Sequence, residues 1–138
     1  MDSLQTLFDL IGVLARRRYQ TAEQYFATLG LNHTEARLLT LLSEEGGAAG
    51  QDALSNRLFV DRTNSGRALK RLEHEAYVRR RREAEDKRAN HVEITAKGRE
   101  AVLQISKLRK KMARGFFGDL TEDEAGRVVE LLRKGLKQ

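Results

Sequence analysis

Cysteine and proline are both missing from this 138-residue chain. The absence of cysteine excludes disulfides, thiolate metal sites and thiol-based redox sensing, and it favours a cytoplasmic setting. The absence of proline excludes a Pro-rich linker, so we expect the weakest joints at the glycine- and alanine-rich residues 46–50 and at residues 115–119. The length suits one domain with appended helices.

Long apolar runs are missing as well. Residues 10–15 form the longest apolar stretch near the start, and this stretch is far too short to cross a bilayer. Three arginines follow it, whereas a signal peptide carries its positive charge before the apolar region. We therefore expect neither export nor association with a membrane.

Motifs that would indicate an enzyme or a metal site are lacking too. His33, His74 and His91 do not have the helical spacing of metal ligands, and there is no Gly-rich phosphate loop or nucleophile elbow. We expect no catalytic residue, no cofactor and no metal. The alternative is that the three histidines converge in space with nearby carboxylates as a zinc site.

Positive charge is what the chain has in excess. It contains 26 Lys and Arg against 20 Asp and Glu, which gives a formal charge of +6 and a pI near 9.9. Such a balance favours an acidic partner such as nucleic acid. The alternative is a charged surface that only keeps the protein soluble.

Apolar residues recur at helical spacing along most of the chain, and two short stretches alternate as strands do. We predict strands over residues 77–82 and 90–95, joined by the sequence EAEDKRA, and helices over residues 4–29, 33–43, 51–58, 62–74, from Thr95 to about Phe116, and from Thr121 to about Leu136. Two short helices joined by a tight turn and followed by a hairpin are the ingredients of a winged helix-turn-helix. The predicted fold is mainly α with a small β-hairpin wing.

Helix starts and buried faces can be read from the same pattern. Asn32 with Glu35, and Thr121 with Glu124, have the spacing of capping boxes, and Asp61 suits the N-cap of the fourth helix. The first helix carries an apolar stripe that needs a partner. We expect the last helix to bury its own apolar residues, which are Val128, Val129, Leu131, Leu132 and Leu136.

The runs LSNRLFVDRTNSGRALKRLEHEAYVRRR and DKRANHVEITAKGR resemble the MarR family of bacterial transcriptional regulators. The wing has that family's pattern of Asp, any residue, Arg, five residues, an aliphatic residue and Thr, here Asp86, Arg88, Ile94 and Thr95. The run LNHTEARLLTLL is similar to the family's second helix. The resemblance covers nearly the whole chain and is strongest over residues 54–98.

This resemblance implies a homodimer with three parts in each chain: an N-terminal dimerisation helix (1–30), a winged helix-turn-helix lobe that binds double-stranded DNA (31–96) and C-terminal dimerisation helices (97–138). Two recognition helices would enter successive major grooves of a pseudo-palindromic operator. The resemblance also favours a repressor that leaves DNA when a small aromatic or anionic effector binds to the protein. The alternative is an interaction or architectural protein that keeps the scaffold without reading sequence.

Two positions depart from the family pattern. Phe59 stands where the family usually has glycine in the turn, so the turn is strained or reshaped unless φ stays negative there. Ser65 and Gly66 stand where an apolar residue and a helix former are more usual. This small pair either softens the recognition helix or lets it sit closer to DNA.

We expect residues 62–74 to form the recognition helix. Arg67 is our first choice for sequence readout, because its planar fork matches guanine O6 and N7. Asn64 suits adenine, while Thr63 and Arg62 suit bases or nearby phosphates. Arg71 suits a phosphate further along the groove, unless it is a solvated residue that pairs with Glu75.

The wing adds a second set of contacts. Arg88 would enter a narrow, A·T-rich minor groove, and Asp86 would orient its guanidinium. Lys87 and two of the arginines 79–82 would attract phosphate, and we include Arg82 among the contacts. Alternation along the strand sends Arg79 and Arg81 to one face and the other two to the opposite face.

Overall fold

The computed structural model describes residues 2–58, 62–83 and 86–137, without the side chains of residues 62, 82, 83 and 86–90. The elements follow the order α1 (Ser3–Ala27), α2 (His33–Glu44), β1 (Ala48–Gly50), α3 (Gln51–Leu58), α4 (Arg62–His74), β2 (Val78–Glu83), β3 (Asp86–Ile94), α5 (Ala96–Phe116) and α6 (Glu122–Gly135). The predicted helices are all present within one or two residues of their expected ends. The fold is therefore mainly helical with a small antiparallel sheet.

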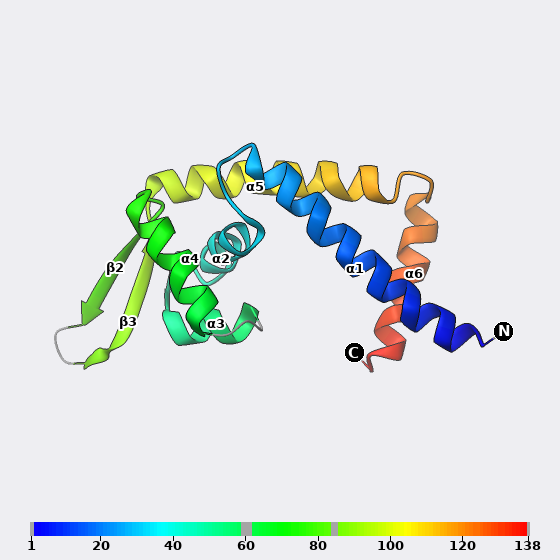
Figure 1. Ribbon diagram of the computed structural model, residues 1–138, viewed down its shortest axis with the longest axis horizontal. Coiled ribbons are helices and arrows are strands. Elements are labelled where there is room, and N and C mark those ends of the chain that lie inside the picture. The colour runs from blue at the N-terminus through cyan, green and yellow to red at the C-terminus, as the bar shows by residue number, and fades with distance from the viewer. Residues whose placement is uncertain (1, 59–61, 84–85, 138) are drawn as a thin grey trace.

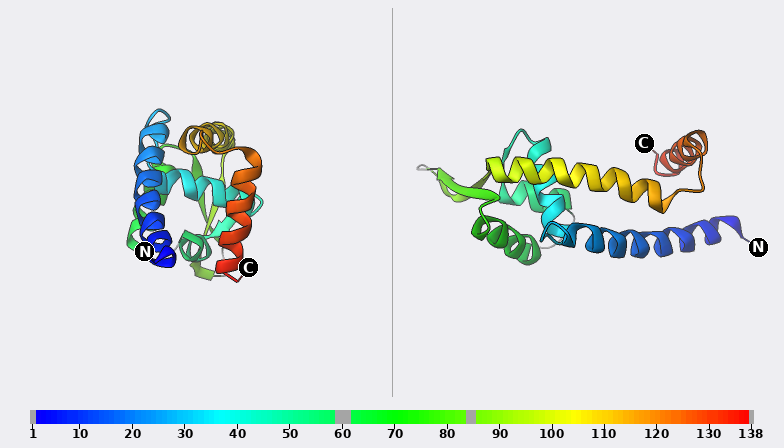
Figure 2. Two further views of the ribbon diagram at one scale, coloured as in Figure 1. Left: turned by 90° about the vertical axis from the view of Figure 1, so that its right-hand side faces the viewer. Right: turned by 90° about the horizontal axis from the view of Figure 1, so that it is seen from above.

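A lobe and a helical extension make up the molecule (Figure 1). The lobe contains α2, α3, α4 and the sheet, and α5 leads away from it to α6. Seen from above, α1 and α5 leave the lobe toward the same end, where α6 and the N-terminus lie (Figure 2). The predicted fold, mainly α with a small β wing, is confirmed.

Polar caps fix the helix starts that the sequence predicted. The Asn32 side chain accepts from the Glu35 amide at 2.8 Å while Glu35 Oε1 accepts from the Asn32 amide at 2.8 Å. Thr121 and Glu124 form the same reciprocal pair at the start of α6. Both capping boxes are confirmed, whereas Asp61 lies outside the described residues. Each box satisfies two amides that would otherwise lack a partner in the first turn.

The sheet differs from the predicted hairpin. Among the described residues it has three strands in the order β1, β3, β2, with Ala49 and Arg80 both opposite Val92. The prediction of a weak joint at residues 46–50 was wrong over its second half. Gly46 and Gly47 have φ of 89° and 99°, which lets the chain turn sharply and lay residues 48–50 against β3. The third strand also begins earlier than predicted, at Asp86.

The core sits inside the lobe and reaches up to α5. Its fully buried large side chains include those of Leu38, Leu39 and Leu42 from α2. These pack in one cluster with further buried residues, among them Leu54, Leu69, Leu72, Val78, Val92 and Ile105. Every element of the lobe contributes, so α4 and the sheet are held on a common support.

The terminal helices keep apolar side chains on the surface. On α1, Leu4 is 78% and Phe8 79% exposed. The expectation that α6 buries its own apolar residues was wrong for the single chain, because α6 has no buried residue and Leu131 is 50% exposed. A helix can bury such a stripe only where another element covers it, and none of the described residues does so here.

Candidate nucleic-acid interface

Helix α4 separates its residues by face as predicted. Ser65, Ala68, Leu69 and Leu72 point into the lobe, and the exposed side chains are those of Thr63, Asn64, Arg67, Lys70, Arg71, Glu73 and His74. The side chain of Arg62, the first residue of the helix, lies outside the described set. The outer face of α4 is thus polar and mainly cationic, as a helix in a major groove requires.

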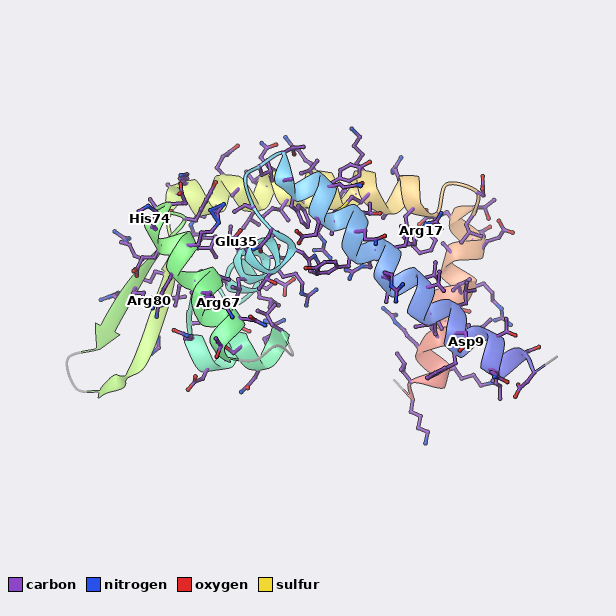
Figure 3. The ribbon with its side chains drawn as sticks, viewed as in Figure 1. Asp9, Arg17, Glu35, Arg67, His74 and Arg80 are labelled. Atoms are coloured by element: carbon purple, nitrogen blue, oxygen red, sulfur yellow. The ribbon has the colours of Figure 1, made fainter. Side chains whose placement is uncertain are left out.

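Arg67 and Asn64 lie together on this outer face. Arg67 Nη2 donates to Asn64 Oδ1 at 3.2 Å, across one turn of the helix. Figure 3 labels Arg67 on α4. Contacts of this kind between exposed residues three apart contribute only about 0.2–0.5 kcal/mol. Both side chains can therefore exchange this contact for hydrogen bonds to base edges.

The small pair in α4 plays two different parts. Ser65 is completely buried, and its hydroxyl lies 2.5 Å from the Ser55 hydroxyl of α3. An apolar residue there would remove this link between the two helices. A Cβ at Gly66 would only meet Gln51 Nε2 at 3.5 Å, an ordinary contact. Phe59, the other departure, lies outside the described residues.

Arg71 makes contacts that the sequence did not suggest. Its Nε lies 2.8 Å from Glu35 Oε2 on α2, and its Nη2 donates to the Gly30 carbonyl at 2.5 Å. The predicted alternative of an ion pair with Glu75 was wrong about the partner. The guanidinium is instead held by the corner between α1 and α2, although the Arg71 side chain remains 49% exposed.

The first three arginines of β2, Arg79 to Arg81, alternate between the faces of the sheet, as predicted. Arg79 and Arg81 approach Glu93 on β3, at 3.8 and 2.6 Å. The hydrogen bond from Arg81, helped by the positive charge of Arg81 and Arg79, holds the pKa of Glu93 below its usual value. Arg80 faces the opposite side, where it lies 3.4 Å from Glu73 Oε2 and donates to Gln51 Oε1 at 2.7 Å.

Four predicted wing residues fall on described backbone without described side chains. Arg82 pairs with Asn90 across the sheet, and Asp86, Lys87 and Arg88 open β3. The expected contact of the Asp86 carboxylate with the Arg88 guanidinium lies outside the described side chains. The backbone places all four at the end of the sheet remote from α5 (Figure 1).

A cavity of about 390 Å³ lies among α1, α2 and α5. Its wall combines cations with apolar and aromatic groups, including Arg18, Phe26, His33, Arg37, Arg109 and Phe116. Burial, followed by the charges of Arg18 and Arg109, lowers the pKa of Arg37. These properties suit a small anion with an apolar body. Sequence spacing could not reveal the cavity, because its residues come from separate helices, with Arg57 of α3 joining those of α1, α2 and α5.

His33 is one of the residues that line this cavity. Its ring packs edge-on to Tyr19 at 5.3 Å and stacks on Phe26 at 6.5 Å between centroids. Burial, then the charges of Arg18 and Arg37, lowers its pKa, while Glu23 opposes the shift. Its Nδ1 is buried without a hydrogen-bond partner. Within residues 2–58, 62–83 and 86–137 no three His, Asp or Glu side chains form a metal site.

The arrangement of α3, α4 and the sheet is that of a winged helix-turn-helix, with α4 in the position of the recognition helix. Residues 29–89 match the model of the MarR family. The transcriptional regulator PrsX of Escherichia coli is 27% identical over 122 residues, which cover 88% of this chain and 73% of PrsX. This chain is therefore similar to the MarR family over residues 29–89 and to a regulator such as PrsX over most of its length.

Two further relatives agree with this assignment. The transcriptional repressor MprA of Escherichia coli K12 is 28% identical over 110 residues, which cover 79% of this chain and 62% of MprA. A mutant of MarR from E. coli complexed with operator DNA has a TM-score of 0.82 at 24% identity, and the match covers 99% of both chains. Members of this family are DNA-binding transcription factors and not enzymes. No helix among the described residues is long and apolar enough to span a membrane.

Proposed function

We propose that this protein is a sequence-specific transcription regulator that binds double-stranded DNA as a homodimer. The exposed Arg67 and Asn64 pair on α4 is the observation that supports this most directly. The opposite face of α4 is buried in the core, so the helix presents these two side chains from a fixed support. The related MarR mutant is complexed with operator DNA, which supports DNA as the partner.

The recognition helix supplies the base contacts in this proposal. Arg67 reads guanine O6 and N7, and Asn64 reads the adenine edge. Thr63 and Arg62 contact bases or adjacent phosphates at the start of the helix. Arg71 was expected to contact phosphate, and its guanidinium contacts Glu35 and the Gly30 carbonyl in this structure.

The wing supplies the flanking contacts. Arg88 enters the minor groove, where the potential is most negative over A·T-rich sequence, and Asp86 orients it. Lys87 and Arg82 attract phosphate. Support comes from their position at the tip of an antiparallel ribbon, on the same side of the molecule as α3 and α4 (Figure 1).

The terminal helices hold two chains together in this proposal. Residues 1–30 and 97–138 form the dimerisation parts, and residues 31–96 form the DNA-binding lobe. The exposed apolar residues of α1 and α6 support this division, because a single chain leaves them in water. A two-fold axis then sets the recognition helices about 34 Å apart, one turn of DNA, so the operator is pseudo-palindromic.

The cavity among α1, α2 and α5 is the proposed site of a small aromatic or anionic effector. Its cations and aromatic rings match both parts of such a molecule. Binding releases the protein from DNA only if the effector has a higher affinity for a spacing of the lobes that does not fit the operator. In this proposal the protein acts in the cytoplasm. It acts as a repressor, because occupation of the operator is enough to block transcription and the relative MprA is a named repressor.

Competition with random DNA tests the proposal. Fragments bound from the source genome are first selected, and the protein is then titrated onto one of them with and without a large excess of random duplex. A specific regulator keeps its complex, because specific binding is typically about 10³- to 10⁷-fold tighter than non-specific binding. An architectural or interaction protein loses it, since counterion release is indifferent to sequence.

A further inference from the structure

The Arg71 side chain ties the recognition helix to the corner between α1 and α2. One guanidinium meets the Glu35 carboxylate through Nε and the Gly30 carbonyl through Nη2. These two acceptors lie in different parts of the corner, Gly30 in the turn and Glu35 in the first turn of α2. Two contacts from a planar group fix orientation as well as distance.

Moving Glu35 out of this arrangement would cost free energy. Its side chain is only 1% exposed, and its Oε1 already accepts from the Asn32 amide in the capping box. Its Oε2 has no hydrogen bond of regular geometry, so the positive charge of Arg71 at 2.8 Å is what compensates it. A buried carboxylate needs such compensation. Arg71 is therefore held by Glu35, while about half of the Arg71 side chain stays exposed.

The same corner forms one wall of the effector cavity. His33, Ala36 and Arg37 line that cavity, and they surround Glu35 in the sequence of α2. The His33 amide also donates to Glu23 Oε1 of α1 at 2.7 Å, which attaches the start of α2 to the first helix. The contact between Glu35 and Arg71 therefore connects this wall to α4 (Figure 3, where Glu35 is labelled).

We infer that Arg71 and Glu35 form a brace that positions the recognition helix for base readout, and that Arg71 is a positioning residue rather than a phosphate contact. This inference rests on the proposed function, since it concerns how α4 reads DNA. The inference also means that contacts with the wall of the cavity determine the orientation of α4. Residue Glu35, which cannot reach DNA, is thereby a determinant of operator binding.

Operator binding by four proteins tests the brace: the wild type, Glu35→Gln, Arg71→Gln and the double variant. Each is titrated onto a selected genomic site and onto random duplex, over a range of salt concentrations and well below its melting temperature. We expect both single variants to lose about 3- to 30-fold in operator affinity, the usual span for residues that transmit coupling. Affinity for random DNA stays within about twofold and the salt dependence is unchanged, because no phosphate contact is lost.

The double variant separates positioning from simple charge compensation. It carries no buried charge, so it regains folding stability, yet we expect its operator affinity to stay as low as that of the single variants. Lys70→Gln is the matched control: it removes one exposed cation from the same helix without touching Glu35, so any loss of affinity should be equal on the operator and on random DNA. Arg71→Lys keeps the charge but cannot span both acceptors, and we expect it to recover only part of the affinity.

Three results would overturn the brace. If the double variant binds the operator like the wild type, Arg71 serves only to neutralise Glu35. If only the Arg71 variants weaken, on both DNAs and with a salt slope reduced by about 1, Arg71 is a phosphate contact after all. If Glu35→Gln is silent, the orientation of α4 does not depend on the corner. A wild type without sequence preference contradicts the proposed function itself, which is a separate outcome.

Discussion

Replacement of Arg67 by alanine should affect DNA reading and folding very differently. In the free protein Arg67 is exposed and its hydrogen bond to Asn64 spans a single helical turn, so its loss should change the free energy of unfolding by less than about 0.5 kcal/mol. On the operator, loss of a bidentate guanine contact should cost about 1–3 kcal/mol, which corresponds to a 5- to 150-fold weaker complex. Titration of DNA by fluorescence anisotropy, beside thermal unfolding, measures both quantities.

Base substitutions make the assay specific. The wild type should discriminate strongly at one position of each half-site, and Arg67→Ala should bind all four bases there nearly equally. Arg127→Ala is the control, because Arg127 on α6 has a similar exposed contact, with Glu130 three residues later. This control should leave base preference intact. Equal weakening of operator and random DNA by Arg67→Ala would show that Arg67 contacts phosphate, and the reasoning about readout would then be refuted.

Three further predictions concern the helix, the dimer and the pH dependence. Gly66→Ala should stabilise the fold by about 0.5–1 kcal/mol in urea unfolding, because the added methyl meets only Gln51 and alanine favours helix; a loss of stability would contradict this. Leu131→Glu should give a folded monomer in sedimentation, since this half-exposed side chain matters only between chains; an intact dimer would exclude α6 from the interface. Folding lowers the pKa of His33 below its ordinary value of 6.5, so the unfolded chain binds more protons than the folded chain as the pH falls past 6.5. The free energy of unfolding should therefore decrease as the pH drops from 7 through 6.5. His33→Gln should make the free energy of unfolding less dependent on pH there, and an unchanged slope would assign the pH dependence to another group.

The structural features that could be predicted from the sequence are those that depend on residues close together in the chain. Asn32 with Glu35 and Thr121 with Glu124 were found as capping boxes, because the partners stand three residues apart. The buried and exposed faces of α4 followed from its helical period. The alternation of the β2 arginines followed from the period of two. These features were predicted because the chemistry and the spacing lie within one element.

Contacts between distant segments could not be predicted in this way. Spacing suggested Glu75 as a partner for Arg71, whereas the actual partner, Glu35, belongs to another helix. Strand β1 has three small residues without β-branching, so it is a strand only because β3 offers free backbone groups beside it.

Helix α5 gives the molecule a mechanical property that follows from its length alone. Its 21 residues run without a break from the base of the sheet to α6, a span of about 31 Å. A rigid rod of that length converts a rotation of about 5° at one end into a displacement of roughly 3 Å at the other. That displacement is comparable to the length of a hydrogen bond. In the proposed dimer, a slight rotation where the two chains meet is therefore large enough to move a lobe into or out of register with the repeat of the double helix.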